Sequence, residues 1–282
     1  MPEFSPKTNT IPINKAFLKG VLSMARVQCN LFSYSLGHGV DIEVTLPSFT
    51  PCNMDQEHTH KLPAKFPVLY LLHGHGNDYA VWHRFTSVDR YAEEERIAVV
   101  TFSVGNVPYD NAPGGNNFYD FLEKELPEFV ENYFPISNKP EERYIAGLSM
   151  GGYGSLLHGL ENPERYSAIG AFSPAVFNKQ QIEDRAQSRG LVLRDLYEVT
   201  EKAVAGGKVP DLFLCIGDKD FLYEPVTEYH NFLEKTWKGA RLRYDDMPGY
   251  KHEFAIWDIE ILNFLQWIKR EDAYKAMGPN QV

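Results

Sequence analysis

Cysteine is scarce in this chain: Cys29, Cys52 and Cys215 are the only three among 282 residues. Their number is odd, their positions are scattered, and no CxxC pair is present. A small disulfide-stapled domain needs an even and dense set of cysteines, so this composition excludes that class. We expect reduced thiols, which are typical of a cytoplasmic protein.

Extended apolar segments and an excess of basic residues are also missing. No uninterrupted apolar stretch reaches the length of about 18 residues that a membrane-spanning helix needs. The most apolar N-terminal stretch, residues 16–24, is interrupted by Lys19 and Gly20, unlike a signal peptide. The 28 Lys and Arg against 38 Asp and Glu give a formal net charge of −10. This balance argues against nucleic acid or an anionic membrane surface as a partner.

The remaining composition is that of an ordinary globular protein, 43% hydrophobic and 23% charged, without internal repeats. Strand-like and helix-like patterns alternate along it, which predicts an α/β fold with a mostly parallel sheet and helices on both faces. We expect a single domain over 1–282, with a loose arm at 1–20 and a helical insertion at 178–209. The expected strands are 27–32, 40–47, 66–72, 97–102, 143–146, 168–172, 211–216 and 242–244. The expected helices are 88–96, 118–134 with a break at Pro127, 152–160, 179–205, 225–238 and 254–268.

The most informative motif is the Gly-x-Ser-x-Gly pentapeptide at 147–151, directly after the expected strand 143–146. A sharp turn between a strand and a helix lifts a serine hydroxyl above the sheet, and the helix directs its free N–H groups at the same place. The pentapeptide alone is a weak signal, but this position between strand and helix strengthens it. Ser149 is therefore the candidate nucleophile.

A serine nucleophile needs a base, and the base needs an acid that orients it. Asp218 and Asp220 both follow the expected strand 211–216, and spacing alone does not choose between them. His252 lies after both, in a loop that leads into the last helix, whereas its downstream rival His230 falls inside an expected helix. His252 is therefore the candidate base.

The reaction also needs N–H donors for the oxyanion. One candidate is the backbone N–H of Met150, the residue after the nucleophile. We assign the second to the backbone N–H of His75 in the glycine-rich loop after the strand 66–72, with Gly76 as its near rival. Reading His73 and His75 as a metal pair is weak, because only Asp78 lies close to them in the sequence. We expect no metal and no cofactor.

Five segments of the chain, taken together, resemble the esterase D / tributyrin esterase family. They are LYLLHGHGNDYAVW, NYFPIS, RYIAGLSMGGYGSL, GDKDFLYE and KHEFAIWD, and the similarity covers roughly residues 27–270 in the expected order. That family also includes S-formylglutathione hydrolases, feruloyl esterases and mycolyltransferase antigens. The resemblance implies an α/β-hydrolase fold and cleavage of short acyl esters without a cofactor.

Carried over by motif, the family's catalytic residues match Ser149, Asp220 and His252, and its oxyanion donors match the amides of Met150 and His75. The motif favours Asp220 because an apolar pair, Phe221-Leu222, follows it and is expected to pack inward. The chain departs from the family in two places. Phe254 stands where many members have Trp, and the segment 178–209 is longer and more charged, so both are expected to border the substrate pocket.

The sequence thus predicts a serine carboxylesterase for acetyl to butyryl or feruloyl esters, small or linked to carbohydrate. An S-formylglutathione hydrolase type of thioesterase is the nearest alternative, followed by an acyltransferase and by a binding protein without activity. Homo-oligomer formation stays open. The residues expected to line the substrate pocket are Gly74, Gly76, Trp82 and Tyr223, with Tyr109, Phe118 and Tyr119 as further aromatic candidates.

Overall fold

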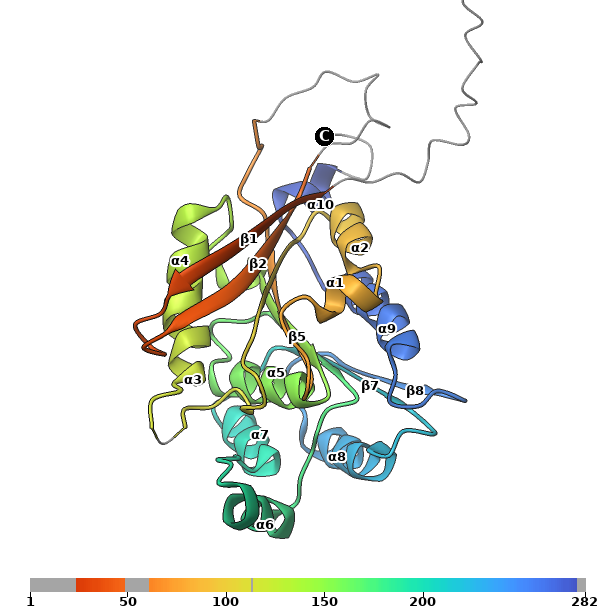
Figure 1. Cartoon of the computed structure of the whole chain (residues 1–282). Coiled ribbons are helices and arrows are strands. Elements are labelled where there is room, and N and C mark those ends of the chain that lie inside the picture. Colours follow the sequence, from red (N-terminus) through yellow and green to blue (C-terminus); the bar gives the residue numbers. More distant parts are fainter. Residues whose placement is uncertain (1–23, 49–60, 113, 278–282) are drawn as a thin grey trace, which may run out of the picture.

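A computed structural model describes residues 24–48, 61–112 and 114–277 (Figure 1). The expected arm at 1–20 and Cys52 lie outside the described residues. The described strands form one eight-stranded sheet in the order β1-β2-β4-β3-β5-β6-β7-β8. Strands β1 and β2 pair antiparallel with each other, β2 pairs antiparallel with β4, and all remaining pairs are parallel. The strands are β1 (Met24–Phe32), β2 (Gly39–Pro47), β3 (Val68–Leu72), β4 (Ala98–Phe102), β5 (Arg143–Leu148), β6 (Ala168–Phe172), β7 (Asp211–Gly217) and β8 (Leu242–Met247).

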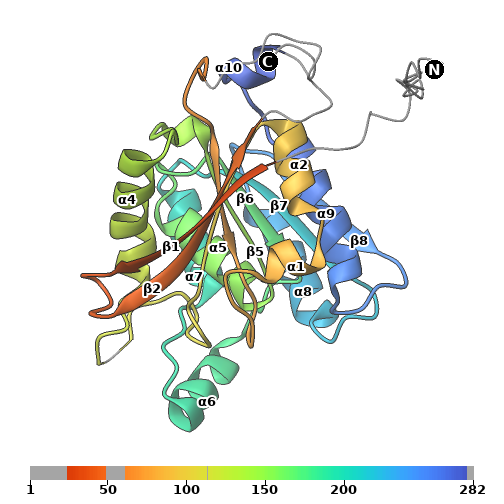
Figure 2. The same ribbon diagram turned by 45° about the horizontal axis from the view of Figure 1, so that its top comes forward.

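Helices cover both faces of this sheet (Figures 1 and 2). Alternate residues of the central strands point to opposite faces, as the pleat requires. Val68, Tyr70 and Leu72 of β3 pack with α4, α5, α7 and α8, whereas Leu69 and Leu71 pack with α1, α2 and α9. Because both faces are buried, β3 and β4 consist almost wholly of apolar residues. The helices are α1 (Val81–Phe85), α2 (Val88–Glu95), α3 (Phe118–Asp120), α4 (Leu126–Tyr133), α5 (Met150–Glu161), α6 (Lys179–Arg189), α7 (Leu196–Ala205), α8 (Tyr223–Thr236), α9 (Phe254–Trp267) and α10 (Ala273–Met277).

The expected alternation of strands and helices, with a mostly parallel sheet, is confirmed. The expected helix 118–134 is helical from Phe118 to Tyr133, but a π-helical segment at Phe121–Glu125 interrupts the regular α-helix and separates α3 from α4. Pro127 lies in the first turn of α4, two residues after this segment, so the irregularity lies next to the expected break. The expected helix 179–205 is likewise two helices, α6 and α7, joined by residues 190–195. In Figure 2, α6 projects from the rest of the molecule.

The parallel strands place their carboxyl ends at one edge of the sheet. The segments that follow β3, β5, β6, β7 and β8 therefore meet along that edge, where α/β proteins bind their ligands. No helix within the described residues has the length and apolar character needed to cross a membrane.

Candidate active site

Ser149 occupies the sharp turn between β5 and α5, as the pentapeptide predicts. Its backbone has φ 55° and ψ −114°, a conformation that non-glycine residues rarely adopt. The two flanking glycines are required by close packing. A Cβ on Gly147 would lie 2.3 Å from the carbonyl oxygen of Gly151, and a Cβ on Gly151 would lie 2.5 Å from that of Leu72. The turn can form only because both side chains are absent.

Backbone hydrogen bonds from two neighbouring elements hold this strained turn. The Ser149 N–H donates to the Phe172 carbonyl of β6 at 2.9 Å. The Ser149 carbonyl accepts from the N–H groups of Tyr153 and Ala175, each at 3.0 Å. A strained conformation that costs about 1–3 kcal/mol persists only where surrounding contacts hold it in place. These three hydrogen bonds hold the backbone of Ser149 in this way.

Asp220 and His252 form a hydrogen-bonded pair. The Nδ1 of His252 lies 2.8 Å from Oδ2 of Asp220, and the other carboxylate oxygen of Asp220 accepts from the Leu222 N–H at 2.9 Å. Asp220 is buried, with 5% of its surface exposed. A carboxylate on Nδ1 keeps the proton there, so the neutral ring presents Nε2 as a proton acceptor.

Spacing alone does not decide whether Asp218 or Asp220 is the catalytic acid, but the structure gives Asp218 different hydrogen-bond partners. Its Oδ1 accepts from the Gly249 N–H at 2.6 Å, and its Oδ2 lies 3.3 Å from Nζ of Lys219. The amide of Gly249 and then the charge of Lys219 lower the pKa of this carboxyl. Asp218 thus ties down the loop that carries His252 but makes no hydrogen bond to the imidazole.

Aromatic rings enclose His252. The ring of Trp257, in the first turn of α9, meets the imidazole edge-on at 4.9 Å and donates its indole N–H to Oγ of Ser173 at 3.1 Å. The ring of Phe221 lies 4.6 Å from the imidazole. Of the pair expected to pack inward, Leu222 packs against the core, whereas Phe221 is 75% exposed and the expectation is wrong for it. It instead covers the imidazole from the solvent side.

The loop after β3 lies against the nucleophile turn. A Cβ on Gly74 would approach Ser149 Cβ to 3.3 Å, which places this loop beside the serine. The Gly76 N–H already donates to Oδ1 of Asn106 at 2.7 Å. The N–H groups of His75 and Met150 have no acceptor among the residues that the structure describes, which favours His75 over its rival Gly76 as the second oxyanion donor.

His73 has a structural role. Its Nδ1 donates to the Gly74 carbonyl at 2.8 Å, and its Nε2 accepts from the Val104 N–H at 3.0 Å. Both ring nitrogens are thus used, and burial lowers the pKa of the ring. Within the described ranges, no group of three or more His, Cys, Asp or Glu residues is arranged to hold a metal ion.

A cavity of about 400 Å³ opens beside Ser149. Its walls come from the loops after β3, β4 and β7, from α5, and from the segment that follows β6 and includes α6. The lining residues are His75, Asn106, Pro108, Ser149, Met150, Tyr153, Ala175, Phe177, Arg185, Leu191, Leu193 and Phe221.

None of the four expected pocket residues is among these lining residues, and two of them, Trp82 and Tyr223, lie away from the cavity. Trp82 is fully buried, donates its indole N–H to the Leu72 carbonyl at 3.0 Å and packs against Phe172. The hydroxyl of Tyr223 donates to Asp246 at 2.8 Å. Trp82 therefore belongs to the core and Tyr223 to the β8 side of the sheet, so neither has the expected place in the pocket.

The further aromatic candidates do not line this cavity either. Tyr109 and Phe118 are core residues, and Tyr119 stacks on His158. Phe254 stacks on Phe85 and does not border the cavity. Gly74 and Gly76 shape the loop beside Ser149 without lining the cavity themselves.

Other lining residues were not predicted. Tyr153 lies one helical turn after Ser149 on α5, a spacing that could have indicated it. Phe177 follows β6, and nothing in its local sequence distinguishes it from a core aromatic. The segment 178–209 was expected to border the pocket, and Arg185, Leu191 and Leu193 do line the cavity.

Known proteins are similar to this chain over most of its length. A family model described as "Putative esterase" matches residues 33–268. An acetyl esterase of Caldicellulosiruptor saccharolyticus is 28% identical over 268 residues, covering 88% of this chain and 99% of that protein.

Two solved structures from Staphylococcus aureus are similar over most of the chain. The fluorophosphonate-binding serine hydrolase FphF is 26% identical with a TM-score of 0.74, over 88% of this chain and 99% of that one. The S-formylglutathione hydrolase FrmB is 28% identical with a TM-score of 0.72, over 87% and 99% of the two chains.

Proposed function

Since the chain belongs to the esterase family and has an α/β-hydrolase fold, we propose that it hydrolyses short-chain acyl esters with Ser149, His252 and Asp220 as its catalytic residues. As a family member it is a carboxylic ester hydrolase. The catalytic residues, the acyl group and the natural ester are the parts that we propose.

In this proposal, Oγ of Ser149 attacks the ester carbonyl carbon while Nε2 of His252 takes the hydroxyl proton. The Asp220 carboxylate holds the imidazole and stabilises the imidazolium. The carbonyl oxygen becomes an oxyanion and accepts hydrogen bonds from the N–H groups of Met150 and His75. The C–O bond of the ester then breaks, and the alcohol leaves with the proton from His252.

The acyl group now sits on Ser149, and water removes it. Nε2 of His252 takes a proton from the attacking water and returns it to Oγ of Ser149, so the enzyme is restored and a carboxylic acid is released.

The observation that carries this proposal is the hydrogen bond between Asp220 and His252 at the same sheet edge as the strained Ser149 turn. Asp220, Ser149 and His252 come from segments far apart in the sequence, after β7, after β5 and after β8. An imidazole oriented by a buried carboxylate has the arrangement that a serine hydrolase needs.

The substrates that we favour are acetyl to butyryl esters. The apolar side chains of Tyr153, Phe177, Leu191 and Leu193 suit an acyl chain, and the similarity to an acetyl esterase points the same way. A feruloyl ester, or an acyl group linked to carbohydrate, is the larger substrate to test in the same cavity. We thus propose a small-molecule or carbohydrate-linked ester as the binding partner. We propose neither nucleic acid nor a membrane as a partner.

A thioesterase is the second candidate, because the similar structure FrmB is an S-formylglutathione hydrolase. A serine acyl-enzyme forms equally from an oxygen ester or a thioester, so the residues above do not separate the two activities. The unpaired thiols of Cys29 and Cys215 fit a cytoplasmic location, which stays a prediction.

The test is steady-state hydrolysis of p-nitrophenyl acetate, butyrate and octanoate, of methyl ferulate, and of a matched acetyl thioester. We expect the highest kcat/KM for acetate or butyrate and no measurable turnover by Ser149→Ala. Turnover of none of these esters by folded protein would contradict the proposal, and a thioester rate well above that of its oxygen ester would favour the second candidate.

A further inference from the structure

Arg185 contributes a cation to the wall of the cavity beside Ser149. It lies on α6, in the charged segment 178–209, and is half-buried. Its guanidinium carbon lies 4.3 Å from the ring centre of Phe177, another lining residue. Among the described lining residues it is the only Lys or Arg, and most of the others are apolar.

Within the described residues, the charge of the Arg185 guanidinium is not balanced by a bound carboxylate. Glu183 and Asp184 are close to it in sequence, yet among the residues that the structure describes no carboxylate forms an ion pair with Arg185 and no acceptor forms a hydrogen bond with it. Arginine donates through a planar fork that matches a carboxylate, and stacking on an aromatic ring restricts the motion of that fork. Within the described residues its hydrogen-bonding capacity is therefore unused, and the guanidinium lies over the ring of another residue that lines the cavity.

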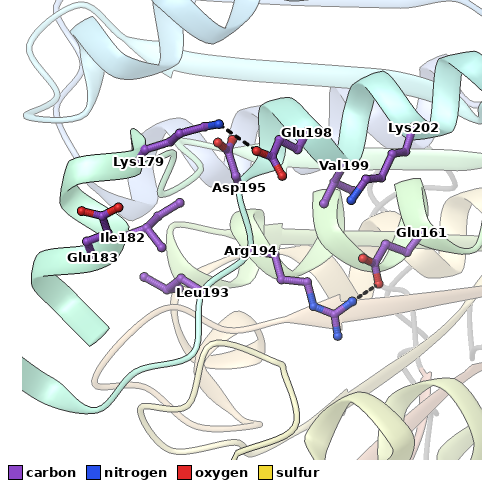
Figure 3. Close-up of a pocket in the computed structure, with 10 residues that line it drawn as sticks. All are labelled: Glu161, Lys179, Ile182, Glu183, Leu193, Arg194, Asp195, Glu198, Val199 and Lys202. Atoms are coloured by element: carbon purple, nitrogen blue, oxygen red, sulfur yellow. Dashed lines mark hydrogen bonds and ion pairs between the residues drawn. The ribbon is translucent and has the colours of Figure 1, made fainter. Parts of the chain in front are cut away.

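Arg194, a further arginine of this segment, shows the opposite arrangement. Its guanidinium donates to both carboxylate oxygens of Asp110 at 2.8 Å and also pairs with Glu161. Figure 3 shows the Glu161 pair in the neighbouring pocket, with a second pair between Lys179 and Glu198. Arg194 and Lys179 of that pocket are thus paired with carboxylates, whereas Arg185, which lines the cavity beside Ser149, has no such pair among the described residues.

The segment that carries Arg185 is anchored to the catalytic helix. The hydroxyl of Tyr153 on α5 donates to the Arg194 carbonyl at 3.3 Å and accepts from the Arg194 N–H at 2.7 Å. Leu191 and Leu193, on either side of Val192 in the same connection, line the cavity together with Arg185. Arg185 therefore belongs to a wall of the cavity that is hydrogen-bonded to α5.

We infer that Arg185 binds a carboxylate of the substrate, so that the enzyme prefers esters bearing one negative charge on the part that fills this cavity. This inference rests on the proposed function and narrows its substrate class. The carboxylate can belong to the acyl part or to the alcohol part, since either can occupy a cavity that reaches Ser149. Apolar walls hold the carbon chain, and the guanidinium donates two hydrogen bonds to the charged end.

Two matched pairs of esters test this inference and separate the two sources of charge. The acyl pair is p-nitrophenyl hydrogen adipate and its terminal amide, which differ only in the charge of the acyl chain. The alcohol pair is 4-acetoxybenzoate and 4-acetoxybenzamide. For wild-type enzyme we expect one pair to show a higher kcat/KM for the charged member. In Arg185→Gln this ratio of charged to neutral ester should fall by about 10- to 100-fold, the loss of a charge-assisted hydrogen bond, mainly through KM.

Two further variants sharpen the result. Arg185→Lys keeps the charge but not the planar fork and should retain part of the preference. Lys179→Gln removes a cation from the same helix that does not line this cavity and should leave the ratio at the wild-type value. Ratios within about twofold of wild type in Arg185→Gln, for both pairs, would overturn the inference, since a charge-assisted bond is worth more than that.

Binding to Ser149→Ala keeps this test separate from the proposed function. Calorimetric titration of that variant with the adipate ester and its amide should show tighter binding of the charged ester, and the double variant Ser149→Ala/Arg185→Gln should lose the difference. A preference that persists without any hydrolysis by wild type would refute the proposed function alone. Hydrolysis without any preference that depends on Arg185 would refute this inference alone.

Discussion

Ser149 has a conformation that costs free energy, and that cost can be measured. At φ 55° and ψ −114° an L-residue is strained by about 1–3 kcal/mol, whereas glycine adopts these angles freely. Glycine also loses more conformational entropy on folding than alanine does. This cost of about 0.5–1 kcal/mol offsets part of the strain energy that glycine removes. We therefore expect Ser149→Gly to be more stable than Ser149→Ala by about 1 kcal/mol, measured by urea unfolding.

The activity of the same two variants tests the nucleophile. Both should lose about 10⁴-fold or more of kcat on p-nitrophenyl acetate, because removing one member of a catalytic triad disables the whole unit. Circular dichroism checks that each variant is folded. A folded Ser149→Ala protein with near wild-type kcat would show that another residue is the nucleophile.

Asp218 and Asp220 are two residues apart but should differ greatly in effect. Asp220→Asn would replace the acceptor of the Nδ1 proton and favour the wrong imidazole tautomer, so kcat should fall by about 10⁴-fold. Asp218→Asn would remove a charge from a loop contact to the Gly249 N–H, and kcat should fall far less. Measuring kcat for both variants decides between them, and the reverse order would move the catalytic acid to Asp218.

At the residue scale, the candidate site residues that can be proposed from the sequence are those that local motifs mark. Ser149 and Met150 belong to a turn whose glycines are forced by close packing, and the histidine–glycine loop is equally local. The cavity wall was predicted only as a segment. Whether Trp82 or Phe177 faces a cavity depends on contacts with distant strands, and both residues look alike as apolar aromatics in a one-dimensional pattern.

The connection between α6 and α7 depends on one buried charge pair. Asp110 is 3% exposed, and Arg194 donates to both of its carboxylate oxygens. Arg194→Leu would leave Asp110 buried without its main partner and should reduce the free energy of unfolding by about 2–4 kcal/mol. Lys179→Leu is the matched control, because its pair with Glu198 lies at the surface and should matter little. Equal midpoints of urea unfolding for both variants would contradict this view of Arg194.

At the element scale, periodicity predicted where most strands and helices lie, and the expected strand 168–172 has the bounds of β6. It did not predict the π-helical segment Phe121–Glu125, where two acidic residues are buried. Glu123 pairs with His158, and Glu125 accepts from the hydroxyl of Ser33. Such carboxylates look solvent-exposed in a sequence pattern, because their partners lie tens of residues away.

At the scale of the whole molecule, the fold links distant parts of the chain at one edge of the sheet. Each of Ser149, Asp220 and His252 follows a different parallel strand, so their position at the same edge of the sheet is a consequence of topology.

A buried carboxyl in the helix layer makes the stability of the whole molecule depend on pH. Glu260 of α9 is fully buried, and its Oε1 accepts from the Asn263 side chain at 3.0 Å.

Burial, and then the negative charge of Asp245, raise the pKa of Glu260 to about 8. In the unfolded chain this carboxyl would titrate near its ordinary pKa of about 4.3. Between these two values the folded protein holds a proton that the unfolded chain has released, so this group's contribution to stability falls as pH rises.

The variant Glu260→Gln keeps the shape of the side chain but removes the titrating group. We expect its melting temperature to be closest to that of wild type near about pH 4, below the unfolded pKa, and to exceed it by at least about 3 °C near about pH 8.5. Glu228→Gln, at an exposed carboxyl on α8, should show no such divergence. Parallel melting curves for wild type and Glu260→Gln across this range would mean that Glu260 is ionised in the folded protein despite its burial.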